Sequence, residues 1–367
     1  MTFWQWSGKY IRGLKAGEYL KIILALLIFS LIVIIHELGH FLLAKKNDIA
    51  VTEFSLGMGP RLFSTVKGET RYSIKLLPFG GSCLMVGEDE ESDDVNAFNN
   101  KSVFARISVV FAGPLFNFLL AFVLSIFIVG SIGYDAPVVW KISEGYPAET
   151  AGMEAGDKII RLNDTRIHVY REVSLFVQLN QKNGASPVEV EYERDGERYT
   201  VSLTPRQAEN GMYYLGFTGS GVRTKGGPLT TLKYSAYEVK YWIYTTLKSL
   251  GMLFEGQVSA DDVSGPVGIV NIIGDTYEES KSDGAFYVWL NMLNIAILLS
   301  ANLGVMNLLP IPALDGGRLV FLIVEGIRRR PVPPEKEGMV HAIGFLLLLV
   351  LIGLVTYQDI ARLITGG

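Results

Sequence analysis

Two histidines and a glutamate lie close together in a long apolar stretch. His36, Glu37 and His40 form the pattern H-E-x-x-H. On a helix, residues four apart share one face, so both imidazoles can bind one ion while the carboxylate reaches a water molecule attached to that ion. Zinc is the metal expected at such a pattern, with the glutamate as general base. The spacing therefore predicts a zinc-dependent hydrolytic site.

A tetrahedral catalytic zinc ion needs a third protein ligand and keeps its fourth position for water. Asp315 is the best candidate, because it lies in the segment N-L-L-P-I-P-A-L-D-G-G, residues 307–317. Two prolines and two glycines there predict irregular backbone, which a membrane protein tolerates where the backbone is buried or lines water. The alternative is a solvated acid in a turn. His168 and His341 have no supporting motif.

The elements that must position these residues are four apolar stretches, residues 22–44, 107–132, 286–312 and 339–357. Each is near the roughly 20 residues that a helix needs to cross hydrocarbon. Of the 33 Lys and Arg and 37 Asp and Glu side chains in the chain, only Glu37 falls inside them. An ionisable residue within a membrane helix indicates function. We therefore expect a polytopic α-helical membrane protein with four transmembrane helices.

Composition excludes other classes of protein. The 367-residue chain has a formal net charge of −4 and only 19% charged residues, so we expect a lipid bilayer and no nucleic acid as its partner. The single cysteine, Cys83, excludes an intrachain disulfide framework and a zinc site made of several cysteines.

Charge in the loops predicts the orientation. Residues 45–106 and 318–336 carry thirteen Lys and Arg, against five near the two chain ends. The positive-inside rule places these two loops in the cytoplasm, and both termini and the long loop after the second span outside it. His36 lies about 21 Å along the helix from residue 22. The metal site is therefore expected within the bilayer of the cell membrane, near its cytoplasmic face.

Between the second and third spans the sequence predicts a small β-rich domain. Alternating apolar residues on both sides of Asp195-Gly196 indicate a β-hairpin. Residues 229–254 read as an amphipathic helix at the membrane interface, or alternatively one packed on the soluble domain. We therefore expect four parts. Residues 1–135 form two spans with a hairpin loop, and residues 136–206 form the β-rich domain. Residues 207–285 form a linker with the interfacial helix, and residues 286–367 form the last two spans.

Several segments resemble signatures of the site-2 protease family of intramembrane zinc metalloproteases. They are residues 36–40, residues 111–117 (F-A-G-P-L-F-N) and residues 307–317. Residues 146–160 resemble the start of a bacterial PDZ domain, and residues 75–81 (K-L-L-P-F-G-G) resemble the family's membrane-associated β-hairpin. The implied fold has four transmembrane helices, this hairpin and one extracytoplasmic PDZ-like, β-rich α+β domain.

The resemblance also implies roles for individual residues. His36, His40 and Asp315 would bind Zn²⁺, and Glu37 would act as the general base.

Further residues would bind the substrate near the metal. The family assigns this role to Asn302 and Asn307, and the resemblance places Gly80 and Gly81 at an exposed strand edge that accepts an extended chain. Asn117 is a further candidate. The alternative for the asparagines is hydrogen bonding between membrane helices, and for Asn117 also close helix packing.

The implied function is zinc-dependent cleavage of transmembrane segments in single-span membrane proteins, after another protease has trimmed their outer part. In the bacterial branch these are anti-sigma factors or leftover signal peptides. The PDZ-like domain would either capture chain ends or exclude bulky outer domains. The alternative function, an intramembrane metal or ion transporter, predicts ionisable residues in several spans, whereas three of the four have no Asp, Glu, Lys or Arg.

Overall fold

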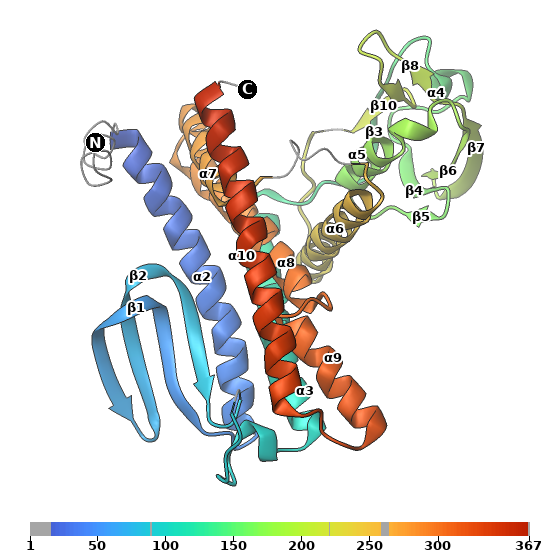
Figure 1. Cartoon of the computed structure of the whole chain (residues 1–367). Coiled ribbons are helices and arrows are strands. Elements are labelled where there is room, and N and C mark those ends of the chain that lie inside the picture. Colours follow the sequence, from blue (N-terminus) through green and yellow to red (C-terminus); the bar gives the residue numbers. More distant parts are fainter. Residues whose placement is uncertain (1–15, 89, 220, 258–263, 366–367) are drawn as a thin grey trace. The chain divides into compact units, whose positions relative to one another are not determined.

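The computed structural model describes residues 16–88, 90–219, 221–257 and 264–365 (Figure 1). The predicted placement of the two chain ends concerns residues 1–15 and 366–367, which lie outside these ranges. The chain forms two compact units. We call them the helical unit, Met1–Leu124 with Thr246–Gly367, and the β-rich unit, Ser125–Thr245.

Within the described residues, four helices are long and apolar enough to cross a membrane, which confirms the four predicted apolar helices. They are α2 (Ala16–Lys46), α3 (Val103–Ile132), α8 (Ala285–Leu308) and α10 (Pro334–Thr365). The third apolar stretch reaches residue 312, but α8 ends at Leu308, where irregular backbone was predicted from the prolines. Leu309 is extended because Pro310 follows it, and a residue before proline avoids the helical conformation.

Two shorter helices complete the helical unit. These are α7 (Pro266–Ser280) and α9 (Asp315–Arg328). Asp359, near the end of α10, accepts hydrogen bonds from the backbone N–H groups of Gly265 (3.1 Å) and Gly268 (2.8 Å). These donors at the N-terminus of α7 have no partner within their own helix. A side chain remote in sequence therefore caps α7.

The predicted hairpin is present and is longer than residues 75–81. Strand β1 (Val51–Lys67) pairs with antiparallel β2 (Thr70–Met85). Phe54 pairs with both Tyr72 and Cys83, so each strand folds back and the first part of β1 has a neighbour on both sides. Cys83 is buried with Ile49, Val51, Phe98, Val109 and Leu322, among other apolar residues. The hairpin thus shares a core with α3 and α9.

The β-rich unit contains a four-stranded sheet in the order β5-β4-β6-β7. Its strands are β4 (Lys158–Leu162), β5 (Thr165–Arg166), β6 (Val188–Arg194) and β7 (Glu197–Leu203). Asp195 and Gly196 join β6 to β7 with positive φ angles of 53° and 85°, which confirms the predicted hairpin turn.

A second pair of strands shows that this fold extends beyond residue 206. Strand β10 (Phe217–Gly219) pairs with β3 (Val139–Ile142), and α5 (Tyr170–Leu179) packs on the same core. The remaining elements of the unit are α4 (Pro147–Thr150), β8 (Arg206–Gln207) and β9 (Tyr213–Tyr214). Short 3₁₀ helices occur at Phe98–Asn100, Gln181–Asn183 and Lys281–Asp283.

Helix α6 (Pro228–Phe254) is the predicted amphipathic helix. Its first part belongs to the β-rich unit, where the Tyr234 ring stacks on Tyr134 at 3.5 Å between centroids. Glu238 forms a 2.8 Å ion pair with Arg171 of α5. These contacts agree with the alternative interpretation of a helix packed on the soluble domain. Its location at a membrane interface stays a prediction.

Candidate metal centre

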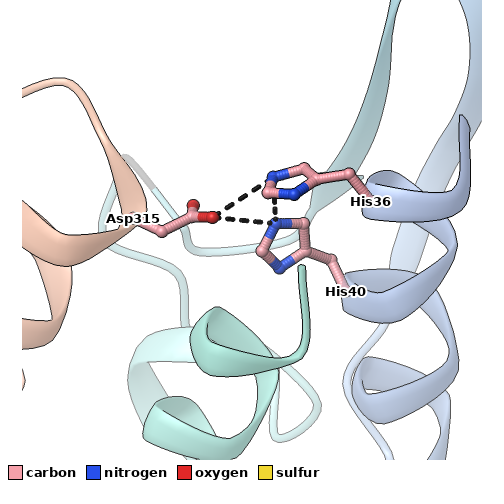
Figure 2. Close-up of side chains that lie close together, drawn as sticks. All are labelled: His36, His40 and Asp315. Carbon is pink, nitrogen blue, oxygen red and sulfur yellow. Dashed lines mark hydrogen bonds and ion pairs between the residues drawn. The ribbon is translucent and has the colours of Figure 1, made fainter. Parts of the chain in front are cut away.

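The three predicted metal ligands converge on one point of the helical unit (Figure 2). His36 and His40 come from α2, and Asp315 is the first residue of α9. Asp315 Oδ2 lies 3.2 Å from His36 Nε2 and 3.4 Å from His40 Nε2. The two Nε2 atoms are 3.2 Å apart. Three different ligand atoms thus form a nearly equilateral triangle.

This triangle fits a tetrahedral zinc ion. Bonds of about 2.0–2.2 Å at tetrahedral angles place ligand atoms about 3.3–3.5 Å apart. Asp315 Oδ2 is buried, and within the described residues it has no hydrogen-bond partner other than the two imidazoles that it faces. The donors are therefore those of a zinc site with a carboxylate ligand.

Glycines let α2 and α3 approach at this point. A Cβ atom on Gly113 of α3 would lie 2.3 Å from His40 Nε2 and 2.7 Å from His36 Cε1. One on Gly39 of α2 would lie 2.4 Å from the carbonyl oxygen of Ala112. Side chains at these positions would displace the imidazoles or separate the helices. The segment 111–117 therefore packs directly against the metal site.

The segment before α9 is built to place Asp315. Ala313 has a positive φ of 75°, and its N–H donates a 2.9 Å hydrogen bond to Nδ1 of His341 on α10. Cβ atoms on Gly316 and Gly317 would lie 2.1 and 2.5 Å from backbone carbonyl oxygens of the preceding turn. His341 thus supports the segment that carries the third ligand. His168, the other histidine considered, lies in the β-rich unit beside Glu172.

Comparisons with known proteins identify the family. The family model of peptidase family M50 matches residues 24–351. A protein of Clostridium acetobutylicum described as a zinc metalloprotease is 39% identical over 94% of this chain and 98% of its own. The zinc metalloprotease RasP of Geobacillus kaustophilus is 32% identical over 93% of this chain and 98% of its own.

The chain belongs to peptidase family M50. This confirms the predicted site-2 protease family and the zinc metalloprotease activity, with Zn²⁺ as its cofactor. Together with the four apolar helices, it indicates a multi-pass membrane protein. Among solved structures, a PDZ domain of a Listeria monocytogenes SdrC-like protein is similar to 24% of this chain and 90% of its own, with 17% identity and a TM-score of 0.22.

In this M50 peptidase the second nitrogen of each imidazole also has a partner. His40 Nδ1 lies 2.9 Å from the backbone carbonyl oxygen of Val109. His36 Nδ1 lies 3.1 Å from the amide nitrogen of Asn117, a fully buried residue of α3. Sequence reasoning named Asn117 as a possible substrate-binding residue, considered the segment 111–117 with Gly113 for close helix packing, and missed Val109. Val109 lies just before that segment.

The hairpin of the M50 peptidase passes next to the predicted general base. A Cβ atom on Gly81 of β2 would lie 2.9 Å from Glu37 Cγ. Gly80 has a positive φ of 81° and packs against Met58. The structure therefore brings Gly81 to the active site, as its predicted role requires.

The two asparagines of α8 are placed differently. The side-chain oxygen of Asn302 accepts a hydrogen bond from the Thr246 hydroxyl of α6. Asn307 lies half-buried in the last turn of α8, where, within the described residues, its side chain makes no hydrogen bond. Asn302 thus has the interhelical bond that the alternative interpretation expected. Substrate binding by both residues stays a prediction.

Proposed function

We propose that this M50 peptidase is an intramembrane endopeptidase that cleaves the transmembrane segments of single-span membrane proteins. The observation that carries the proposal is the position of the metal ligands. His36 and His40 lie in the second half of α2, a helix apolar enough to span a membrane, and are almost fully buried. A peptide bond that reaches this site must itself lie within an apolar segment.

The site residues supply the remaining chemistry of peptide hydrolysis. His36, His40 and Asp315 would hold a zinc ion, which when bound would supply Lewis-acid chemistry at the scissile carbonyl and a water with a pKa of about 7. Glu37 accepts the proton of the attacking water and delivers it to the leaving nitrogen. The donor atoms of His36 and His40 are buried, so the site lies away from bulk solvent.

The substrate must be extended before it is cut. In a transmembrane helix, side chains surround each peptide bond, and each peptide carbonyl accepts a hydrogen bond from the N–H group four residues later. Both features shield the peptide bond from attack. The edge of β2 at Gly81 lies beside Glu37. An unwound segment added to this edge would gain backbone hydrogen bonds and present its carbonyl to the metal. Asn302 and Asn307 would satisfy the polar groups released from the substrate helix.

The proposed orientation follows from the basic loops. Residues 45–106 and 318–336 face the cytoplasm, while the β-rich unit and both chain ends face outward. The active site then lies in the bilayer, near its cytoplasmic face. The substrates are proteins whose outer part another protease has already removed, such as anti-sigma factors or remnant signal peptides. Cleavage in this sequence is called regulated intramembrane proteolysis.

Cleavage of a model single-span substrate in reconstituted vesicles tests this function. Mass spectrometry should locate the cut within the transmembrane segment. Glu37→Gln should keep zinc and lose at least about 100-fold in rate, because general base catalysis contributes about 10²–10⁴-fold. Full activity of Glu37→Gln, or cuts only in soluble segments, would contradict the proposal. Zinc flux across the vesicles without cleavage would favour the transporter alternative.

A second proposed function concerns the β-rich unit, which we propose captures the free C-terminus of a trimmed substrate. A groove of about 500 Å³ lies between α5 and β10. It is lined mainly by apolar and aromatic side chains, including Tyr146, Tyr170, Val173, Val177, Leu215 and Phe217. The Tyr170 hydroxyl donates a 3.4 Å hydrogen bond to the Phe217 carbonyl oxygen. A peptide strand added beside β10 would offer its own N–H groups to such carbonyls and would compete with Tyr170 for this acceptor.

Peptide binding to the full-length protein distinguishes capture from exclusion by size. A fluorescent peptide with an apolar last residue and a free carboxylate should bind, and its C-terminal amide should bind at least tenfold more weakly. Ser174→Trp, at an exposed position that lines the groove, should abolish binding. Thr200→Trp, on an exposed position of β7, is the matched control. Equal binding of the amide, or unchanged binding by Ser174→Trp, would favour the size filter.

A further inference from the structure

The hydrogen bonds behind the two zinc-binding imidazoles constrain their protonation. A neutral imidazole carries a hydrogen on one nitrogen and a lone pair on the other. His40 Nδ1 faces a carbonyl oxygen, that of Val109, at 2.9 Å. A carbonyl only accepts, so His40 carries its hydrogen on Nδ1 and offers the Nε2 lone pair to the metal. The same arrangement is required of His36, whose Nε2 also faces Asp315.

The contact of His36 with Asn117 does not meet this requirement while the NH₂ group of Asn117 faces the ring. His36 Nδ1 faces the amide nitrogen of Asn117 at 3.1 Å, and an amide NH₂ group is only a donor. The other end of the same amide, Asn117 Oδ1, is fully buried and has no hydrogen-bond partner within the described residues. The nitrogen and oxygen of an amide have nearly the same shape and can exchange places by rotation. That exchange gives the Nδ1–H group of His36 an acceptor.

Asn117 is held firmly in this position. It is fully buried on α3, and its backbone carbonyl accepts a 2.8 Å hydrogen bond from the hydroxyl of Ser300, a fully buried residue of α8. Its side chain therefore leaves from a point fixed between two helices and ends at the back of the His36 ring. No substrate needs to contact it for this arrangement to matter.

We propose that Asn117 is a positioning residue of the zinc site, whose amide oxygen accepts a hydrogen bond from His36 Nδ1–H when zinc is bound. The bond fixes the His36 ring with Nε2 towards the metal and selects the tautomer that can bind it. This is the role that a carboxylate or carbonyl usually plays behind a zinc-bound histidine. The buried amide so far assigned to substrate binding or helix packing acts on the metal instead.

Zinc affinity of the purified full-length protein, measured by competition with a chelator, tests the assignment without any substrate. Asn117→Leu keeps the approximate size but not the acceptor, and should weaken zinc binding about 10- to 100-fold. Asn117→Asp keeps an acceptor and cannot donate when ionised, so it should bind zinc within a few-fold of the original protein. Ser125→Ala, at another fully buried polar residue of α3, is the control and should leave the affinity unchanged.

Two results would overturn the proposal. Unchanged zinc affinity in Asn117→Leu would show that the amide does not support the ring. Binding in Asn117→Asp as weak as in Asn117→Leu would show that the amide donates rather than accepts. If Asn117→Leu does not fold, Asn117→Asp alone decides. Because the measurement involves no cleavage, its failure would leave the proposed substrate class untouched.

Discussion

Arg106 and Glu325 form a two-pronged ion pair that joins the first turns of α3 to α9. The two side chains keep only 11% and 14% of their surface exposed. Arg318 forms a second partly buried ion pair, through its Nη1 atom, with Glu88 just after β2. Since α9 begins with Asp315, these pairs fix the helix that carries the third zinc ligand.

The first prediction concerns this attachment. Glu325→Gln should lower the free energy of unfolding by at most about 3 kcal/mol, the lower end for a buried pair, because both side chains retain some exposure. Zinc binding should weaken with it, since Asp315 becomes less well placed. The double variant Arg106→Glu, Glu325→Arg should recover much of both losses. Thermal unfolding and zinc competition measure the two effects.

A surface pair supplies the control for that experiment. Arg161 and Glu191 lie 3.3 Å apart in the β-rich unit, with half of the arginine exposed. Breaking such a pair should cost about 1 kcal/mol or less and leave zinc affinity unchanged. If Glu325→Gln also leaves zinc affinity unchanged, other contacts hold α9 in place.

The second prediction tests the close approach of α2 and α3. Gly113→Ala would place a methyl group 2.3 Å from His40 Nε2. Overpacking of this kind costs about 1–3 kcal/mol, and the part of this cost that falls on the metal-bound state weakens zinc binding, by up to roughly 150-fold. In Gly130→Ala, also on α3, the new methyl group would lie 3.9 Å from its nearest neighbour, an ordinary contact. Equal zinc affinity in the two variants would mean that the imidazoles can move aside without loss.

The metal ligands could be predicted from the sequence because their geometry is local. His36 and His40 share a face of one helix whatever the rest of the fold does, and Glu37 was the only charged residue in the four apolar stretches. Asp315 required one more step, the recognition that two prolines and two glycines interrupt a membrane helix. All three predicted ligands meet in the structure.

The rest of the site depends on contacts between residues far apart in sequence. Asn117 contacts His36 across 81 residues, and His341 contacts Ala313 across 28. Neither contact has a periodic pattern that could reveal it. The same holds for β10, whose pairing with β3 moved the end of the β-rich fold beyond residue 206. The apolar stretch 286–312 runs past the end of α8 at Leu308, because composition shows the break at the prolines but not the residue at which the helix ends.

The third prediction concerns the cap of α7. Asp359 accepts hydrogen bonds from the N–H groups of Gly265 and Gly268. Asp359→Ala would leave these donors without their acceptor, at a cost of about 1–3 kcal/mol. Hydrogen exchange in the first turn of α7 should become faster, whereas Asp359→Asn, which keeps one acceptor oxygen, should give an intermediate rate. Unchanged exchange in Asp359→Ala would show that water or another group replaces the carboxylate.

The last prediction separates the metal from the general base. Gly81→Ala would place a methyl group 2.9 Å from Glu37 Cγ without adding anything near the ligand atoms of the two histidines. The Glu37 carboxylate would shift, and a displacement of about 1 Å can cost on the order of 100-fold in rate. We therefore expect zinc affinity close to that of the original protein together with a large loss of cleavage. Leu84→Ala, at an exposed position of the same strand, should keep both properties. Loss of zinc from Gly81→Ala would instead place β2 among the supports of the metal site, and full cleavage would show that Glu37 acts from a position independent of this strand.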